Sequence, residues 1–204
     1  MGALAALFAV LAAAVVGSGA VTIFDGAVNA FFEPYRTQPW LAVFLWLTTL
    51  GTGATLIAVM ATASGLLWAY RRAGLLLPLW ICYLGAEVTT WVLKFAIGRS
   101  RPEFLTTAKA ASPSFPSAHS AGSMAVYGIV AWLVTHEAQQ RGPQAPQRGA
   151  VLRVRVAVGL LILAIGFSRI FLSVHYLTDV VGGFLVGLFW VMAARALADR
   201  DAGR

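Results

Sequence analysis

Long, uninterrupted apolar stretches dominate the chain, and short segments between them hold most of the charged residues. A membrane-spanning helix needs about 20 mostly apolar residues, because the hydrocarbon core is about 30 Å thick. The stretches are continuous rather than alternating in short strands, which favours helices over a closed barrel. We therefore expect an all-α, polytopic membrane protein, a single domain over residues 1–204. Its predicted bundle of six transmembrane helices covers residues 2–23, 53–70, 74–97, 117–136, 152–171 and 176–195.

Two of these predicted spans have unusual boundaries. Residues 39–70 form one apolar run that would reach about 48 Å as a single helix, well beyond the membrane core. We therefore place a break at Gly51-Thr52-Gly53 and expect a short interfacial or partly inserted helix over residues 39–50. Residues 2–23 resemble the apolar part of a signal peptide, but they lack a basic start and run long, which favours a retained membrane helix.

The composition agrees with a bilayer as the surrounding solvent. Of the 204 residues, 59% are hydrophobic and 11% are charged, whereas a soluble domain has about 25% charged residues. The formal net charge of +7 does not indicate nucleic acid, because the basic residues lie at segment ends and in loops rather than along one helix. The single cysteine, Cys82, excludes an intramolecular disulfide or a thiolate metal site and is expected to pack in the apolar core.

Arginines set the expected orientation in the membrane. With six spans, nine of them fall on one side, which the positive-inside rule assigns to the cytoplasm: Arg71, Arg72, Arg141, Arg148, Arg153, Arg155, Arg195, Arg200 and Arg204. The loop 136–150 and the C-terminus are then cytoplasmic. The connections after the third and fifth spans face the periplasm or the exterior. We expect a multi-pass protein of the cell (inner) membrane.

Three polar clusters lie on the side opposite to these arginines: KFAIGRSRP (94–102), PSFPSAHS (113–120) and FSRIFLSVHYLTDVVGG (167–183). Each has an ordinary structural explanation. Lys94 at a span end can reach the headgroups, and Ser117 can cap a helix. Arg99 could contact a lipid headgroup, but we favour its assignment to the solvated loop. Taken together, however, ionisable residues at membrane depth usually mark a functional site.

The third cluster contains an oriented imidazole. On a helix, His175 and Asp179 are four residues apart and would share a face. The carboxylate can accept the Nδ1–H, which leaves Nε2 with a free lone pair. Such a histidine is a nucleophile or a base. His119, in the second cluster, is a second imidazole that is free to act as an acid.

The same clusters provide an anion site. Lys94, Arg101 and Arg169 supply positive charge, and a helix that begins near Ser117 directs backbone N–H groups at an anion. Carboxylates are not clustered as Mg²⁺ would require. The residues therefore favour phosphoryl chemistry with no metal and no cofactor.

These motifs resemble those of the type 2 phosphatidic acid phosphatase superfamily, which also contains bacterial acid phosphatases and vanadium haloperoxidases. The family pattern is Lys, six residues, Arg-Pro; then Pro-Ser-Gly-His; then Ser-Arg, five residues, His, three residues, Asp. The matching residues lie within 94–179: Lys94, Arg101-Pro102, Pro116-Ser117-Ala118-His119, Ser168-Arg169, His175 and Asp179. Ala118 replaces the usual glycine. Because a helix start has ordinary helical φ, we expect alanine to be tolerated there.

The resemblance implies a role for each matched residue. His175 would attack phosphorus and become a phosphohistidine, Asp179 would orient it, and His119 would protonate the leaving oxygen and then activate water. The phosphate-binding groups would be Lys94, Arg101, Ser117, the Ala118 N–H and Arg169. The implied substrate is a lipid phosphate of the outer leaflet: undecaprenyl diphosphate, phosphatidate or phosphatidylglycerol phosphate. The short chain slightly favours recycling of a bacterial carrier lipid.

Three other functions have to be weighed. A phosphotransferase would pass the phosphoryl group to a lipid or sugar hydroxyl through the same intermediate. Vanadium peroxidase chemistry uses a related site, but usually in soluble proteins. A transporter or channel would distribute polar residues through the membrane depth, whereas here they gather near one surface. The expected partners are the lipid phosphate substrate and the surrounding membrane lipids, with no nucleic acid and with the oligomeric state left open.

Overall fold

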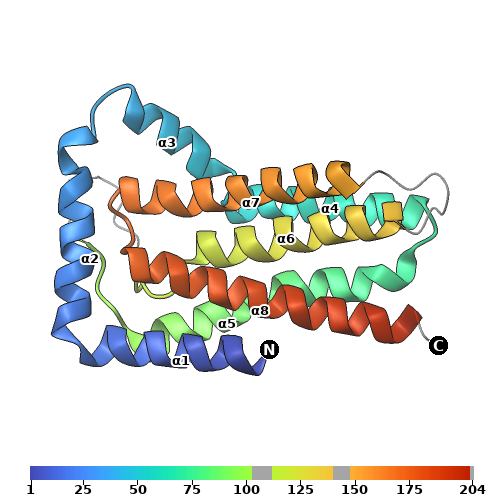
Figure 1. Cartoon of the computed structure of the whole chain (residues 1–204), viewed down its shortest axis with the longest axis horizontal. Coiled ribbons are helices and arrows are strands. Elements are labelled where there is room, and N and C mark those ends of the chain that lie inside the picture. Colours follow the sequence, from blue (N-terminus) through green and yellow to red (C-terminus); the bar gives the residue numbers. More distant parts are fainter. Residues whose placement is uncertain (103–111, 140–147, 203–204) are drawn as a thin grey trace.

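The computed structural model describes residues 1–102, 112–139 and 148–202, and within these residues every regular element is a helix. Figure 1 shows α4 to α8 running along the length of a bundle, α1 along its flank and α2 across one end. The predicted all-helical class is confirmed over the described residues. The elements are α1 (Gly2–Gly17), α2 (Gly19–Phe32), η1 (Glu33–Tyr35), α3 (Trp40–Thr49), α4 (Gly53–Ala69), η2 (Ala73–Leu75), α5 (Leu76–Ile97), α6 (Ala118–Gln139), α7 (Arg148–Phe171) and α8 (Leu177–Ala202).

In the described part of the chain, three helical stretches are long and apolar enough to cross a membrane: Ala73–Ile97, Arg148–Phe171 and Leu177–Arg200. The number rises to five if each of two bent helix pairs counts as one span. α6, which covers the predicted span 117–136, is not among them. It lies in the centre, in contact with α4, α5, α7 and α8, and only Val134 of residues 118–136 is exposed. Its neighbours shield it, so α6 can carry polar residues, and the count of six spans stays a prediction.

The prediction of one continuous helix over residues 2–23 is wrong. The chain breaks at Ser18, which is extended (φ −112°, ψ 112°), and the helices on either side meet at 90°. Gly17 and Gly19 flank the break, and glycine is a poor helix former. α2 buries two polar residues, Asp25 and Asn29, both bonded to arginines outside α2. These contacts hold α2 across the end of the bundle (Figure 1).

The predicted break at Gly51-Thr52-Gly53 is confirmed. α3 ends at Thr49, α4 begins at Gly53, and the two helices meet at 44°. Thr52 caps α4, because its Oγ1 accepts the Thr55 N–H at 3.4 Å. A Cβ on Gly51 would lie 2.6 Å from Cγ2 of Ile165, so glycine lets this corner approach α7.

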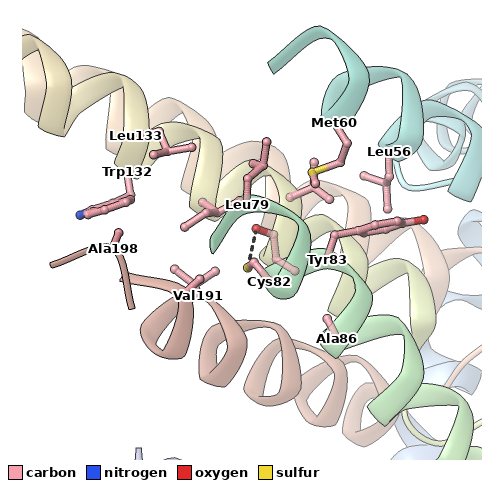
Figure 2. Packing of buried hydrophobic residues seen from close by; sticks show 14 residues of the cluster. Leu56, Met60, Leu79, Cys82, Tyr83, Ala86, Trp132, Leu133, Val191 and Ala198 are labelled. Carbon is pink, nitrogen blue, oxygen red and sulfur yellow. Dashed lines mark hydrogen bonds between the residues drawn. The ribbon is translucent and has the colours of Figure 1, made fainter. Parts of the chain in front are cut away.

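The hydrophobic core lies between α4, α5, α6 and α8 (Figure 2). Cys82 is buried in it, as predicted, and its Sγ lies 3.5 Å from the Ala125 carbonyl oxygen. Near the α2 end of the bundle, glycines of α8 allow this helix to lie close to α6. A Cβ on Gly183 would lie 2.5 Å from the Ser117 carbonyl oxygen. Small residues allow such close contact of helices, which here holds the start of α8 against the start of α6.

At the end of the bundle opposite α2 lie the end of α4, the start of α7 and the end of α8 (Figure 1), where most of the arginines expected on one side of the membrane are found. Those that the structure describes follow α4 or lie in the first turns of α7 and the last turns of α8: Arg71, Arg72, Arg148, Arg153, Arg155, Arg195 and Arg200. Arg141, Arg204 and residues 140–147 of the predicted cytoplasmic loop lie outside the described residues. The three polar clusters meet at the α2 end.

Candidate active site

α5 ends within the first polar cluster because Gly98 takes the left-handed conformation, with φ 67°, that glycine favours. Lys94 lies in the last turn of α5 and is only 3% exposed. Its Nζ donates to the carbonyl oxygens of Pro113 at 2.7 Å and Ser114 at 3.2 Å. These bonds join the first cluster to the second. Lys94 is therefore a fixed, buried cation and does not extend to the headgroups.

Arg101, from the first cluster, is bonded to the residue that precedes the second cluster and to a residue of the third. Its Nε donates to the Ser112 carbonyl oxygen at 2.9 Å, and its NH1 donates to the Val174 carbonyl oxygen at 2.8 Å. The same NH1 lies 3.2 Å from Nε2 of His175. A guanidinium has only donors, so Nε2 must accept, and the proton of the neutral imidazole must lie on Nδ1. Arg101 thus fixes the tautomer of His175.

The Nδ1–H of His175 faces Asp179. Nδ1 lies 3.2 Å from Oδ2, and the same oxygen accepts the Tyr176 N–H at 2.9 Å. The prediction that the two residues share a helical face is wrong, because α8 begins only at Leu177 and His175 lies in the preceding turn. The carboxylate instead reaches back across the N-terminus of α8. Burial lowers the pKa of His175 to about 4, although Asp179 acts to raise it, so the imidazole is neutral at pH 7.

Ser117 and Ala118 open α6 beside this pair. The Ser117 hydroxyl is buried and caps the helix by accepting the Ser120 N–H at 3.4 Å, as the sequence allowed. Its backbone N–H donates to the Asp179 carbonyl oxygen at 2.9 Å, which ties α6 to α8. Ala118 is the first residue of α6 and does not have a positive φ. Alanine therefore fits this position without strain, as expected.

His119, in the first turn of α6, packs against the corner between α3 and α4. A Cβ on Gly51 would lie 3.1 Å from its Cδ2. The charges of neighbouring residues from the first and third clusters act on this imidazole: Lys94, Arg101, Arg169 and His175. His119 and His175, from the second and third clusters, therefore lie in the same polar site.

Arg169 occupies the last turn of α7. Its NH1 donates to the hydroxyl of Thr48 on α3, a contact that the sequence did not reveal. Its Nε is buried and has no partner among the described residues. A buried charged donor without an acceptor is costly, so this nitrogen suits an anionic ligand. Ser168 instead donates to the Ile165 carbonyl oxygen within its own helix at 2.6 Å.

The assignment of Arg99 to the solvated loop is wrong. Its guanidinium lies between two fully buried carboxylates, with NH1 2.6 Å from Oδ1 of Asp179 and NH2 2.7 Å from Oδ2 of Asp25. Sequence reasoning also missed Asp25, which lies on α2. The available signal was a carboxylate within a largely apolar stretch of a membrane protein, where ionisable residues usually have a specific partner.

Relatives of known sequence are phosphatases. The PAP2 superfamily matches residues 75–201. Phosphatidylglycerophosphatase B of Bacillus subtilis (strain 168) is 30% identical over 196 residues, which cover 95% of this chain and 93% of that protein. Glucose-6-phosphatase 3 of Bos taurus is 29% identical over 197 residues, but the match covers 55% of its length.

Solved structures share the fold. A transmembrane PAP2 type phosphatidylglycerolphosphate phosphatase from Bacillus subtilis superposes with a TM-score of 0.85 at 28% identity, covering 97% of this chain and 95% of that one. LpxE of Aquifex aeolicus superposes with a TM-score of 0.61 at 20% identity, covering 83% and 93%. The sequence match, the fold and the three motifs agree, and the chain belongs to the PAP2 superfamily.

Proposed function

We propose that this protein hydrolyses a phosphate monoester or a diphosphate of a membrane lipid through a phosphohistidine intermediate. The geometry of His175 carries the proposal, because its Nδ1–H is directed at Asp179 and its Nε2 at the Arg101 guanidinium. A neutral imidazole in this tautomer presents a lone pair next to a fixed positive charge. Phosphate is an anion that such a charge attracts and holds for attack.

In the first step, Nε2 of His175 attacks phosphorus and the bond from phosphorus to the leaving oxygen breaks. The lone pair of Nε2 forms the new bond, and the electron pair of the broken bond goes to the leaving oxygen. That oxygen takes a proton from His119, whose protonated form is favoured once the negative charge of the bound phosphate offsets the surrounding cations. The imidazole of His175 becomes positively charged, and Asp179 stabilises that charge through the Nδ1–H.

In the second step, water replaces the histidine on phosphorus. His119, now neutral, takes a proton from the water as its oxygen attacks, and the electron pair of the nitrogen–phosphorus bond returns to Nε2. Inorganic phosphate leaves, and both histidines recover their starting states. The alternative function, phosphotransfer, differs only in the acceptor, which would be a lipid or sugar hydroxyl instead of water.

Fixed donors would hold the oxygens of the transferred phosphoryl group. Arg169 has a buried Nε without a partner among the described residues, and Arg101 would exchange its contact with Nε2 for a phosphate oxygen. We assign the remaining bonds to Lys94, the Ser117 hydroxyl and the Ala118 N–H. One such donor typically lowers a barrier by about 3 kcal/mol. Because fixed cations supply the charge, we propose a reaction that needs no metal ion.

Phosphatidylglycerol phosphate is our first candidate substrate. The Bacillus subtilis sequence match and the Bacillus subtilis solved structure both carry that activity in their names, and each match covers nearly the whole length of this chain. Undecaprenyl diphosphate and phosphatidate offer the same chemistry, with a tail that stays in the bilayer. We place the site on the outer side of the cell membrane, with six spans, because of the arginines at the opposite end of the bundle.

Phosphate release in detergent tests the function. The panel is phosphatidylglycerol phosphate, undecaprenyl diphosphate and phosphatidate, with water-soluble glucose 6-phosphate as the control that lacks a lipid tail. We expect release from at least one lipid, background rates for His175→Ala and His119→Ala, and a loss of roughly 10²-fold for Ser117→Ala, which removes one donor. Wild-type turnover by purified His175→Ala would contradict the mechanism.

Labelled substrate distinguishes the two candidate reactions. A phosphoryl label on wild-type protein that is stable in base and labile in acid supports the phosphohistidine. Label released as inorganic phosphate supports hydrolysis, whereas label found only on an added lipid or sugar alcohol supports phosphotransfer. Unchanged rates in excess EDTA are expected, and loss of activity that Mg²⁺ restores would reject metal independence.

A further inference from the structure

Two carboxylates from different elements meet at the N-terminus of α8. Asp179, in the first turn, accepts the Tyr176 N–H at 2.9 Å through Oδ2. Asp25, from α2, accepts the Thr178 N–H at 3.1 Å through Oδ1 and the Thr178 hydroxyl through Oδ2. Both carboxylates are fully buried. A helix N-terminus favours negative charge, but two neighbouring carboxylates disfavour each other's ionised form.

Arg99 places one positive charge between these two carboxylates. Its NH1 lies 2.6 Å from Asp179 Oδ1, and its NH2 lies 2.7 Å from Asp25 Oδ2. NH1 also donates to the Thr178 hydroxyl at 2.8 Å, and the guanidinium lies 4.2 Å from the centre of the Tyr176 ring. A planar guanidinium with partners on two sides and an aromatic face beside it has one orientation. Arg99 is therefore a fixed link between α2 and α8.

The link reaches His175 through Asp179. The two carboxylate oxygens of Asp179 have separate partners, since Oδ1 faces Arg99 and Oδ2 faces the Nδ1 of His175. Rotating the carboxylate away from Arg99 would also move Oδ2 away from the imidazole. Asp25 in turn offsets the positive charge that Arg99 brings close to His175.

We propose that Asp25 and Arg99 are positioning residues of the catalytic centre, which fix the Asp179 carboxylate and balance the charge around His175. This inference rests on the proposed role of Asp179 as the partner of His175. It adds α2 to the catalytic centre, although Asp25 lies outside the matched region 75–201 and Arg99 is not one of the family motif residues. The other charged or titratable groups around His175 come from α5 and the segment after it, from α6 and from α7: Lys94, Arg101, His119 and Arg169.

Removing one charge at a time tests the inference. Arg99→Gln leaves two carboxylates without their cation, so the proton of His175 is held more tightly and its titration midpoint moves to higher pH. Asp25→Asn leaves Arg99 with one carboxylate, so the midpoint moves to lower pH. We expect about one pH unit in each direction, with kcat/KM reduced roughly 10-fold to 100-fold in each variant. The double variant Asp25→Asn/Arg99→Gln should return to within about half a unit of wild type, because the charges cancel.

The midpoint is measured directly by titrating protein labelled with ¹⁵N-histidine. The chain has three histidines, and the signal lost in His175→Gln identifies the relevant one. Arg99→Lys keeps the charge and should keep the midpoint. Elution as a single species and the unfolding temperature in detergent identify any variant that has lost its fold.

Shifts of both single variants in the same direction, or unshifted midpoints, overturn the inference, since a merely structural contact would not produce opposite signs. The titration does not depend on turnover. A wild-type protein that releases no phosphate from any lipid would therefore reject the proposed function, while the opposite shifts would still report the link between Asp25, Arg99 and His175.

Discussion

NH1 of Arg101 lies 3.2 Å from Nε2 of His175, the atom that would attack phosphorus, although the two residues are 74 positions apart in the chain. The same guanidinium is bonded to the carbonyl oxygens of Ser112 and Val174. Arg101 is therefore held beside the nucleophile by the segment that precedes His175 itself. The proposed phosphate-binding group and the proposed nucleophile form one rigid unit.

Replacement of Arg101 by lysine should lower kcat/KM roughly 100-fold, even though the charge is kept. A single ammonium group cannot span Ser112, Val174 and His175 as the guanidinium fork does. Phosphate release from the preferred lipid measures the loss. Arg200→Lys, at the far end of α8, is the matched control and should stay within about twofold of wild type. If Arg101→Lys were as active as this control, the geometry of the guanidinium would not be needed for catalysis.

The acid titration of His175 should lie near pH 4, because burial lowers its pKa to about 4 in the folded protein. A free histidine titrates near about 6.5, so the unfolded chain binds an extra proton between these values. The contribution of His175 to stability therefore rises as the pH increases through this window and is lost as the pH falls. The ¹⁵N titration checks the midpoint, and a value near that of free histidine would contradict the burial.

Gly51→Ala should impair catalysis. The new Cβ would lie 2.6 Å from Ile165 Cγ2 and 3.1 Å from His119 Cδ2, so the corner or the imidazole must move. A shift of a catalytic group by about 1 Å can reduce turnover by about 10²-fold. Gly53→Ala is the control, because its Cβ would meet nothing within 4 Å. Equal kcat values for the two variants would show that the backbone between α3 and α4 can shift to accommodate the Cβ without moving His119.

Gly183→Ala should lower stability. Its Cβ would lie 2.5 Å from the Ser117 carbonyl oxygen, and backbone at this distance cannot rotate away as a side chain can. Overpacking of this kind costs about 1–3 kcal/mol, which would appear as a lower unfolding midpoint in detergent. Gly159→Ala on α7 has open space around it and should be neutral or slightly stabilising. An unchanged midpoint for Gly183→Ala would mean that α6 and α8 can separate at little cost.

A fluorescent protein fused to the C-terminus should be fluorescent, if it is of a type that folds only in the cytoplasm. This expectation follows from the arginines of α7 and α8 at one end of the bundle. Alkaline phosphatase fused at the same point, which needs an oxidising compartment, should be inactive. The reverse pattern would place the proposed site on the cytoplasmic side.

The sequence was informative where the deciding forces are local. The break near Gly51 follows from helix length, since residues 39–70 are too long for one span, and the structure bends there by 44°. Family motifs likewise identified the residues that the structure gathers around His175. That alanine is tolerated at position 118, where the family has glycine, could be predicted because a helix start has ordinary helical φ.

The sequence was uninformative where distant partners decide. Nothing local distinguishes Arg99 from a solvated loop residue, because its two carboxylates lie 74 and 80 positions away. The turn at Ser18 has the same origin, since polar contacts of α2 hold that helix across the bundle. The His175–Asp179 spacing suggested a shared helical face, yet Asp179 reaches back from the first turn of α8 instead.

The sharp corner at Ser18 has a practical consequence for protein engineering. A chain trimmed to residues 75–201, the range that matches the PAP2 superfamily, would retain both histidines and every motif cation, but it would delete the carboxylate that α2 delivers to the guanidinium of Arg99. Chimeras and minimal versions of this enzyme should therefore carry residues 1–35 together with the recognised motifs.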